Sequence, residues 1–343
     1  MRRLLNTLYI TSEDSYLALD GENVIVKKGE TIAARFPLHT LEGIISFAYA
    51  GASPALMGAC AERNAALSFC TPSGRFLART VGESSGNVFL RRQQYRIADD
   101  KRRSCSIASA MLIGKVYNCR RNIERAIRDH GMRIDCDRMR NVSSSLRSSL
   151  QKIRSAQSIE ELRGLEGDAA SEYFSVFDEL ILRSRESFYY HGRSRRPPLD
   201  NVNALLSFVY MLLAGACTNA LEANGLDSFV GFLHSDRPGR HSLSLDLMEE
   251  LRPCLADRFV LTLINNRVIQ PDDFVKSESG AVSIKDESRR KLLSSWQEKK
   301  REVITHPYLD EKIPIGLIPF VQAQLLARHL RGDVEEYPPF LLK

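Results

Sequence analysis

The stretch VGESSGNVFLRRQQYRIADD, residues 81–100, separates two parts of the chain that follow different hydrophobic patterns. It begins with GESSGN at 82–87, a run of Gly, Ser and Asn that is typical of linkers. From Phe89 onward, apolar residues recur three and four positions apart, which is the spacing of an amphipathic helix. The sequence therefore predicts a change of architecture near residue 85, from strands to helices.

The residues before this stretch, 4–80, have the pattern of a small β domain. LNTLYIT, YLALDGENVIVKK and GETIAARFPL are short runs rich in β-branched and aromatic residues, which favour strands. Asp20-Gly21 is a typical hairpin turn. One short helix is expected at 53–65, with Ser53 as its N-cap.

The residues after the stretch predict helices almost throughout. DNVNALLSFVYMLLAGACTNALEANG is a long helix that Asp200 or Asn201 caps and that ends at Gly225. Further helices are expected after residue 245 and over 286–303 and 316–331. Strands followed by helices predict an α+β fold and argue against a doubly wound nucleotide-binding fold.

This organisation predicts four consecutive parts. They are a small N-terminal β-rich domain at 1–85, which we expect to mediate dimerisation, a linker and helix start at 86–104, a larger all-helical catalytic domain at 105–334 and an extended C-terminal tail at 335–343. The tail, EEYPPFLLK, has no helical period, and its large apolar side chains are costly to leave in water. We expect it either to fray or to dock in a groove of a partner protein, and favour the partner.

The composition is that of a soluble globular protein. Of the 343 residues, 43% are hydrophobic and 26% charged, which is enough apolar material for two domains. The longest apolar stretch, 204–216, is shorter than the roughly 18 residues that a membrane-spanning helix needs, and the N-terminus lacks a signal-peptide pattern. We therefore expect a cytoplasmic protein with no membrane contact. The seven cysteines include no CxxC pair, so we expect reduced thiols rather than a zinc site.

Basic residues are concentrated between Arg91 and Arg128. This span holds eleven basic and three acidic residues, a net charge of +8, whereas the whole chain carries +6. A local basic excess on helical spacing is typical of a surface that binds polyanions, and nucleic acid is the interpretation that we favour. The alternative is an ordinary solvated helix face.

Two segments contain a single candidate catalytic side chain each. Glu166 lies in RGLEGDAASEYF at 163–174, where an acid near a helix start also serves as a cap, which on composition alone is the more common role. His234 closes the apolar run GFLH, and a histidine in such a run is usually a satisfied core residue. Neither residue by itself indicates chemistry.

A third segment, DLMEE at 246–250, carries three acids. On a helix, Asp246 shares one face with Glu249 and Glu250, and stacked acids repel each other unless solvent or a cation intervenes. One ion held by such acids, a histidine and a glutamate would be Mg²⁺ or Mn²⁺, since oxygen ligands suit both ions and an imidazole favours Mn²⁺. The ion would activate water or a 3′-hydroxyl and stabilise charge on a phosphate. The alternative is a structural corner ahead of a solvated helix start.

Four segments together resemble a known family. LEGDAASEYF, RSRRPPLDNVNALLSFVYMLL, GFLHSDRPGRHSLSLDLMEELRP and the tail EEYPPFLLK are similar, in this order, to segments of the CRISPR-associated integrase that acquires spacers, called Cas-one. The chain resembles the subtype I-C-like members. Proteins of that family pair a small N-terminal β domain with a larger helical catalytic domain, in agreement with the predicted fold.

The resemblance implies a set of catalytic and metal-binding residues. The family's glutamate in a Leu-Glu-Gly context is Glu166 here, and its histidine after Gly-Phe-Leu is His234. Its third ligand is an acid on the next helix, where Glu249 fits best and Asp246 is an additional or alternative ligand. The implied cofactor is Mg²⁺ or Mn²⁺.

The resemblance also implies the reaction and the partners. Family members are homodimers, and two dimers flank a dimer of the small adaptation protein Cas-two. The complex joins the 3′-hydroxyls of a captured DNA duplex, the prespacer, to the ends of a CRISPR repeat by transesterification. Basic residues would then hold DNA phosphates. They are Arg91, Arg92, Arg120, Arg121, Arg125, Arg195, Arg196, Arg237 and Arg240.

Two other functions use the same features. A non-catalytic DNA-binding scaffold would keep the basic surface and would act without a metal ion. A stand-alone nuclease would cleave branched or damaged DNA without a partner or a repeat substrate. The complete set of Glu166, His234 and Glu249 favours an enzyme over a scaffold.

Overall fold

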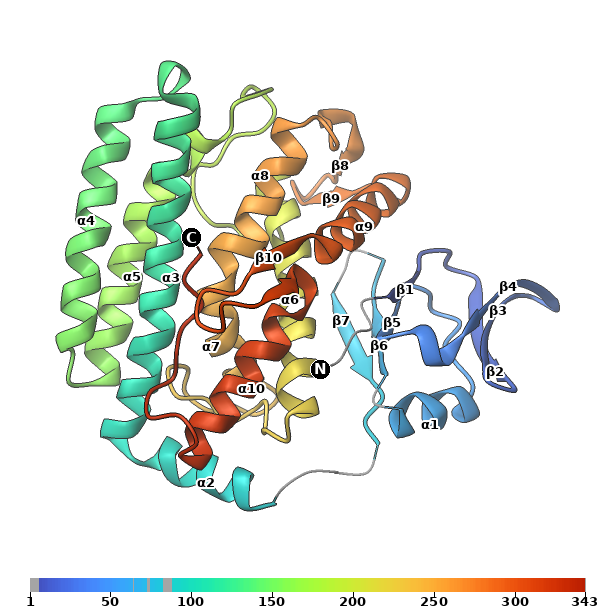
Figure 1. Ribbon diagram of the computed structural model, residues 1–343. Helices are drawn as coiled ribbons and strands as arrows, with labels where there is room; N and C mark the ends of the chain where they lie inside the picture. The colour runs from blue at the N-terminus through green and yellow to red at the C-terminus, as the bar shows by residue number, and fades with distance from the viewer. Residues whose placement is uncertain (1–5, 64, 73–74, 83–87, 343) are drawn as a thin grey trace. The chain divides into compact units, whose positions relative to one another are not determined.

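The computed structural model describes residues 6–63, 65–72, 75–82 and 88–342. The order of elements, strands and then mainly helices, confirms the α+β fold (Figure 1). The chain divides into two compact units, each built from several segments: unit 1 comprises 1–85, 283–303 and 314–317, and unit 2 comprises 86–282, 304–313 and 318–343. Most of the predicted linker GESSGN lies outside the described residues.

Two sheets form in the N-terminal segment of unit 1. The four-stranded sheet has the order β1-β5-β6-β7, with strands Thr7–Ile10, Gly43–Ser46, Ala66–Cys70 and Phe76–Arg79. The three-stranded sheet is β2-β3-β4, with strands Ser15–Asp20, Asn23–Lys28 and Thr31–Pro37. Asp20 pairs with Asn23, so the predicted hairpin is present, and Gly21 takes the positive φ of 58° that its turn requires.

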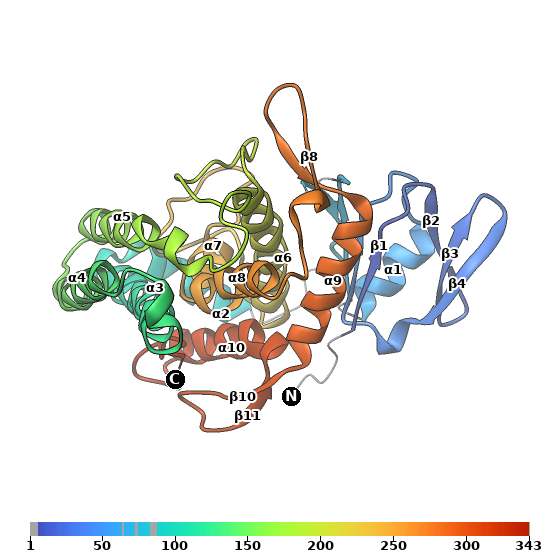
Figure 2. The same ribbon diagram turned by 90° about the horizontal axis from the view of Figure 1, so that it is seen from above.

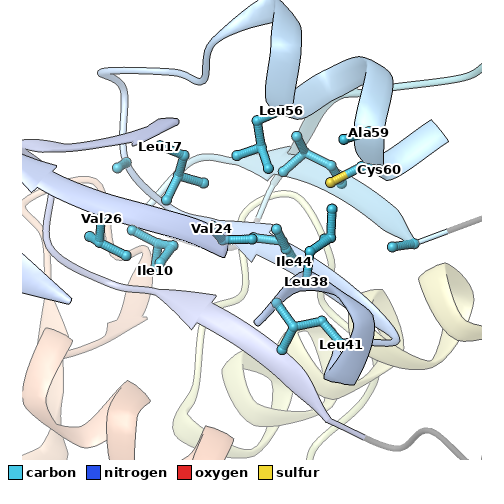
Figure 3. Packing of buried hydrophobic residues seen from close by; sticks show 13 residues of the cluster. Ile10, Leu17, Val24, Val26, Leu38, Leu41, Ile44, Leu56, Ala59 and Cys60 are labelled. Atoms are coloured by element: carbon cyan, nitrogen blue, oxygen red, sulfur yellow. The ribbon is translucent and has the colours of Figure 1, made fainter. Parts of the chain in front are cut away.

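The core of unit 1 forms where helix α1, Pro54–Glu62, packs against these strands (Figure 3). Leu17, Ile44 and Leu56 are fully buried there. Ser53 caps the helix as predicted, because its hydroxyl accepts a hydrogen bond of 3.2 Å from the Leu56 amide.

Helix α9, Asp286–Arg301, also belongs to unit 1. Lys300 Nζ lies 2.8 Å from Glu42 Oε2 and 3.1 Å from Thr7 Oγ1, which ties the helix to the strands. The sequence places these residues in the helical domain, since an amphipathic pattern does not reveal against which core a helix packs. Unit 1 therefore includes a helix from the C-terminal part of the chain.

Unit 2 is built mainly of helices. They are α2 Val88–Asp99, α3 Lys101–His130, α4 Cys136–Ser155, α5 Ile159–Ser175, α6 Asn201–Ala223, α7 Ser242–Leu251, α8 Arg258–Asn265 and α10 Ile318–Arg331. Helices α3, α4 and α5 lie side by side (Figures 1 and 2). The region predicted as all-helical also contains four short strands, β8 Phe274–Lys276, β9 Val282–Ile284, β10 Val303–Thr305 and β11 Lys312–Pro314.

Helix α6 is the buried helix that the sequence predicts. Asp200 caps it by accepting a hydrogen bond of 2.7 Å from the Asn203 amide, and Gly225 follows its end with a φ of 77°. Among the described residues it is the one helix long and apolar enough to span a membrane, and 61% of that window is buried in the protein. Its packing against α7 and α10 is that of a core helix.

The C-terminal tail is extended, as predicted, and its two aromatic side chains are buried by this chain itself. Tyr337 is 3% exposed and Phe340 is fully buried within unit 2. The prediction that these side chains dock in a partner's groove is therefore wrong. Their apolar surface is buried by this chain's own helices, and deleting the tail would remove part of the core.

Candidate active site

Helix α5 is tied to the loop that carries His234. Arg163 donates two hydrogen bonds to the Leu233 carbonyl, of 2.6 and 2.9 Å, and one of 3.0 Å to the Ser235 hydroxyl. Arg163 lies three residues before Glu166, so both side chains project from the same side of the helix. This contact brings the Glu166 and His234 segments together, although they are far apart in the sequence.

Asp246 fixes the orientation of His234. Its Oδ1 lies 2.6 Å from His234 Nδ1 and 3.0 Å from the His234 amide, and its Oδ2 accepts hydrogen bonds from the Phe232 and Leu233 amides. Because Nδ1 donates to a carboxylate, the lone pair of Nε2 is left for a ligand. Gly231 lets the backbone come this close to the Asp246 carboxylate, since a Cβ there would lie 2.7 Å from Asp246 Oδ2.

Glu249 is buried between two cations. Its Oε1 lies 2.6 Å from Arg252 Nη1, and its Oε2 lies 2.7 Å from Lys115 Nζ on α3. Burial raises the pKa of Glu249, but Arg252 and Lys115 outweigh it and lower the pKa to about 2. Lys115 Nζ also contacts the carboxylate of Glu166. Two carboxylates from different helices therefore converge on one ammonium group.

The donor atoms at this position fit a hard divalent ion. Glu249 Oε2 is buried and accepts no hydrogen bond of good geometry within the described residues, in spite of the ion pair with Lys115. Glu166 is 29% and His234 24% exposed, so solvent reaches both. No three His, Cys, Asp or Glu side chains of the described chain are already arranged to hold one ion. The ammonium of Lys115 stands between the two carboxylates instead.

Two asparagines on α3 support the helix that carries Glu249. Helix α7 continues into α8 through a π-helical turn, Arg252–Asp257, where Pro253 has no N–H to donate. Asn118 Nδ2 donates a 2.8 Å hydrogen bond to the Glu250 carbonyl, and Asn122 Nδ2 donates one of 2.8 Å to the Pro253 carbonyl. These bonds supply donors to carbonyl groups whose regular helical hydrogen bonds the irregular turn disrupts.

A cavity of about 770 Å³ lies next to Glu166 and Lys115. Its lining includes basic side chains (Arg138, Arg193, Arg195 and Arg252), aromatic side chains (Phe174, Tyr190 and Tyr210) and the acids Glu166, Asp178 and Asp257. The guanidinium groups of Arg193 and Arg252 lie 5.4 and 5.3 Å from the centre of the Tyr210 ring. The cavity therefore has the charge and shape to receive a phosphate-bearing, partly apolar ligand.

Comparisons of the sequence with known proteins give one consistent result. Residues 8–298 match the family model for the CRISPR associated protein Cas1. The CRISPR-associated endonuclease Cas1 1 of Chlorobaculum tepidum is 46% identical over 341 residues, which are 99% of both chains. The chain belongs to the Cas1 family. A Cas1 endonuclease of Rhodospirillum rubrum is likewise 46% identical over the full length of both chains.

Solved structures show the same fold as this Cas1 chain. A casposase bound to integration product superposes with a TM-score of 0.84 at 22% identity, over 98% of this chain and 94% of that one. A CAS1 protein from Thermotoga maritima gives a TM-score of 0.80 at 22% identity, over 95% and 97%. These structures confirm the fold, and the curated relatives confirm the predicted family and enzyme class, a CRISPR-associated endonuclease.

The arginines that the sequence proposes for DNA binding occupy different surroundings in this Cas1 fold. Arg195 lines the cavity beside Glu166. Arg120 and Arg121 pair with Glu124, and Arg125 pairs with Asp129 at 3.2 Å. These three resemble the solvated helix face that was the alternative interpretation. Arg92, Arg196 and Arg237 are exposed, whereas Arg91 and Arg240 are half-buried.

Sequence reasoning missed several residues that build the site. Lys115 and Arg252 contact Glu249, and Arg193 lines the cavity. Arg163 binds the Leu233 carbonyl, next to His234. Lys115 carried a usable signal, because a lysine inside the apolar run MLIGKVY must be paired if it is buried. Arg163 lies one turn before Glu166, so a search of the same helix face would have found it.

Proposed function

We propose that this Cas1 chain joins the 3′-hydroxyl ends of a short DNA duplex to a CRISPR repeat, using Glu166, His234 and Glu249 as ligands of one Mg²⁺ or Mn²⁺ ion. The observation that carries the proposal is the convergence of Glu166 and Glu249 on one cationic position. His234 Nε2 is the third donor, and Asp246 orients the imidazole. Both oxygens of Asp246 already accept hydrogen bonds, which favours Glu249 as the acidic ligand from α7.

The ion, when bound, would stabilise the charge that develops on the attacked phosphate and its oxygens. The chain's own residues hold and orient the reactants. Lys115 must leave the position between the carboxylates, and its ammonium is then free to contact a phosphate oxygen. The attack forms one P–O bond and breaks another, so the joining needs no high-energy cofactor.

The cavity is proposed to hold the DNA strand that carries the reacting phosphodiester. Exposed Arg195 and half-buried Arg193 supply charge for phosphates, and the aromatic rings offer stacking surfaces for bases. The structural neighbours include a casposase bound to integration product and a complex that contains Cas1 and Cas2. On these grounds we propose double-stranded DNA, Cas2 (the Cas-two partner) and a second copy of this chain as its partners in the cytoplasm. The motif resemblance supports an I-C-like subtype.

A joining assay tests the proposal against its alternatives. Purified protein, the Cas2 partner and Mn²⁺ are incubated with a short duplex and a plasmid that contains a CRISPR repeat. We expect covalent joining, which a duplex with 3′-deoxy ends abolishes because it has no attacking hydroxyl. Cleavage of branched DNA without joining would indicate the stand-alone nuclease, and DNA binding unaffected by chelation, without either reaction, would indicate the scaffold.

Lys115→Met should increase the affinity for Mn²⁺ by about tenfold, because it removes the ammonium that competes for the same two carboxylates. The metal-free protein should lose stability, since Glu166 and Glu249 lose their shared counterion. Calorimetric titration with Mn²⁺ and thermal melting with and without a chelator measure both effects. Weaker Mn²⁺ binding in the variant would show that Lys115 supports the site rather than competes with the ion.

Arg195→Gln should weaken DNA binding about five- to tenfold at low salt and reduce the slope of log K against log salt by roughly one. Arg195 is exposed and lines the cavity. The matched control is Arg125→Gln, which should change affinity less than about twofold because Asp129 already pairs with that arginine. Fluorescence anisotropy across a salt series measures both. Equal losses in the two variants would place DNA on α3 as well as in the cavity.

A further inference from the structure

The segment 337–342 makes buried polar contacts that the proposed reaction does not use. The Tyr337 hydroxyl and the Phe340 amide both donate hydrogen bonds to the Glu250 carboxylate, the second of 2.8 Å. Gln322 on α10 completes the group: its Nε2 lies 3.1 Å from Glu250 Oε1 and 2.9 Å from the Tyr337 hydroxyl. An acid, an amide side chain and the tail thus satisfy one another away from water.

A second group of contacts fixes the tail to α3. Asn118 Nδ2 donates a 2.8 Å hydrogen bond to the Phe340 carbonyl, and its Oδ1 accepts one of 2.9 Å from the Leu342 amide. Gly114 lets α3 come close to both α7 and the tail, since a Cβ there would be 2.7 Å from Glu250 Cβ and 3.2 Å from Pro339 Cβ. Residues 340–342 therefore lie beside α3 (Figure 1).

These anchors are direct neighbours of the site residues along the chain. Glu250 follows Glu249, and Gly114 precedes Lys115. Successive residues of a helix point about 100° apart, so a fixed direction for Glu250 also fixes the direction of Glu249. Helix α7 needs such support, because it runs directly into the π-helical turn that contains Pro253.

We propose that residues 337–342 form a strap that sets the rotation of α7 against α3 and thereby holds Glu249 in its ligand position. Tyr337 and Phe340 are positioning residues, and the Glu250 carboxylate accepts a hydrogen bond from each of them. The inference rests on the metal site proposed above. It predicts that loosening the strap weakens ion binding before it unfolds the protein.

The test uses two full-length variants and two controls. Tyr337→Phe removes only the hydroxyl, and Glu250→Gln leaves one acceptor oxygen where the carboxylate offers two to Tyr337, Gln322 and the Phe340 amide. Tyr308→Phe changes an exposed tyrosine, and Leu146→Ala lowers stability from α4, outside these contacts. The dissociation constant for Mn²⁺ is measured by electron paramagnetic resonance. Backbone hydrogen exchange over 243–251 is measured by mass spectrometry without metal.

We expect both strap variants to bind Mn²⁺ roughly tenfold more weakly, as is usual when the support of a ligand is lost. Their α7 amides should exchange about tenfold faster, while those of α4 stay as in the parent. Both controls should keep the parental dissociation constant, which separates positioning from general destabilisation. Parental Mn²⁺ binding and parental α7 exchange in folded strap variants would overturn the inference. If the parent itself binds no Mn²⁺, the proposed metal site fails, and the exchange measurement still decides whether the strap exists.

Discussion

His234→Ala is expected to lower metal-dependent strand joining by more than about 100-fold while the protein stays folded. The imidazole supplies the one nitrogen among the proposed ligands, and losing even an outer partner of a metal ligand costs roughly 10- to 100-fold. The fold should survive, because the side chain is partly exposed and Asp246 keeps three backbone N–H donors. Joining rates with Mn²⁺ and thermal melting test the two parts of this prediction.

Two companion variants make the result specific. Asp246→Asn should lower the joining rate by roughly 10- to 100-fold, since a neutral amide fixes the imidazole less firmly. His130→Ala, at the exposed end of α3, should have no effect. Parental joining by a folded His234→Ala protein would remove this histidine from the site and would leave Glu166 and Glu249 without a nitrogen donor.

Local patterns predicted those parts of the fold that depend on local chemistry. The change from strands to helices, the caps at Ser53 and Asp200 and the hairpin at Gly21 all depend on a few neighbouring residues. The assignment of Glu166, His234 and Glu249 as ligands comes from the family motifs and stays a prediction, whereas the structure confirms the caps and the hairpin. These features survive folding because tertiary contacts do not oppose them.

The three acids of α7 show what spacing along one helix cannot predict. On a helix they share one face, and the sequence suggests a common cation or a common solvent shell. In the structure each acid has its own partner: Asp246 binds His234, Glu249 binds Lys115 and Arg252, and Glu250 binds the tail. Each of these partners except Arg252 comes from another segment, so spacing along α7 could not reveal the division.

Long-range packing also explains why the tail and helix α9 differ from their predictions. The tail has no helical period, and its apolar side chains suggested a partner protein. The structure instead buries Tyr337 and Phe340 within unit 2. The tail's polar groups bond to Glu250, Gln322 and Asn118, which lie on three different helices of that unit. Helix α9 presents the same problem, because the periodicity that predicts a helix carries no information about which core will bury it.

Glu249→Ala is expected to lower the free energy of unfolding by about 3–5 kcal/mol in metal-free buffer. The change leaves Lys115 and Arg252 buried without the carboxylate that lies between them. A loss of this size should lower the melting temperature by roughly 6–15 °C. Glu249→Gln should cost less, since its amide oxygen can still accept a hydrogen bond from Arg252. Chemical denaturation in the presence of a chelator measures both variants.

A double-mutant cycle separates this ion pair from the loss of packing. If the pair with Lys115 causes most of the effect, combining Glu249→Ala with Lys115→Met should recover about 1–3 kcal/mol relative to the sum of the single losses. Additive losses would mean that the two charges do not stabilise each other. Recovery would support the proposal that Lys115 holds Glu166 and Glu249 together in the metal-free protein.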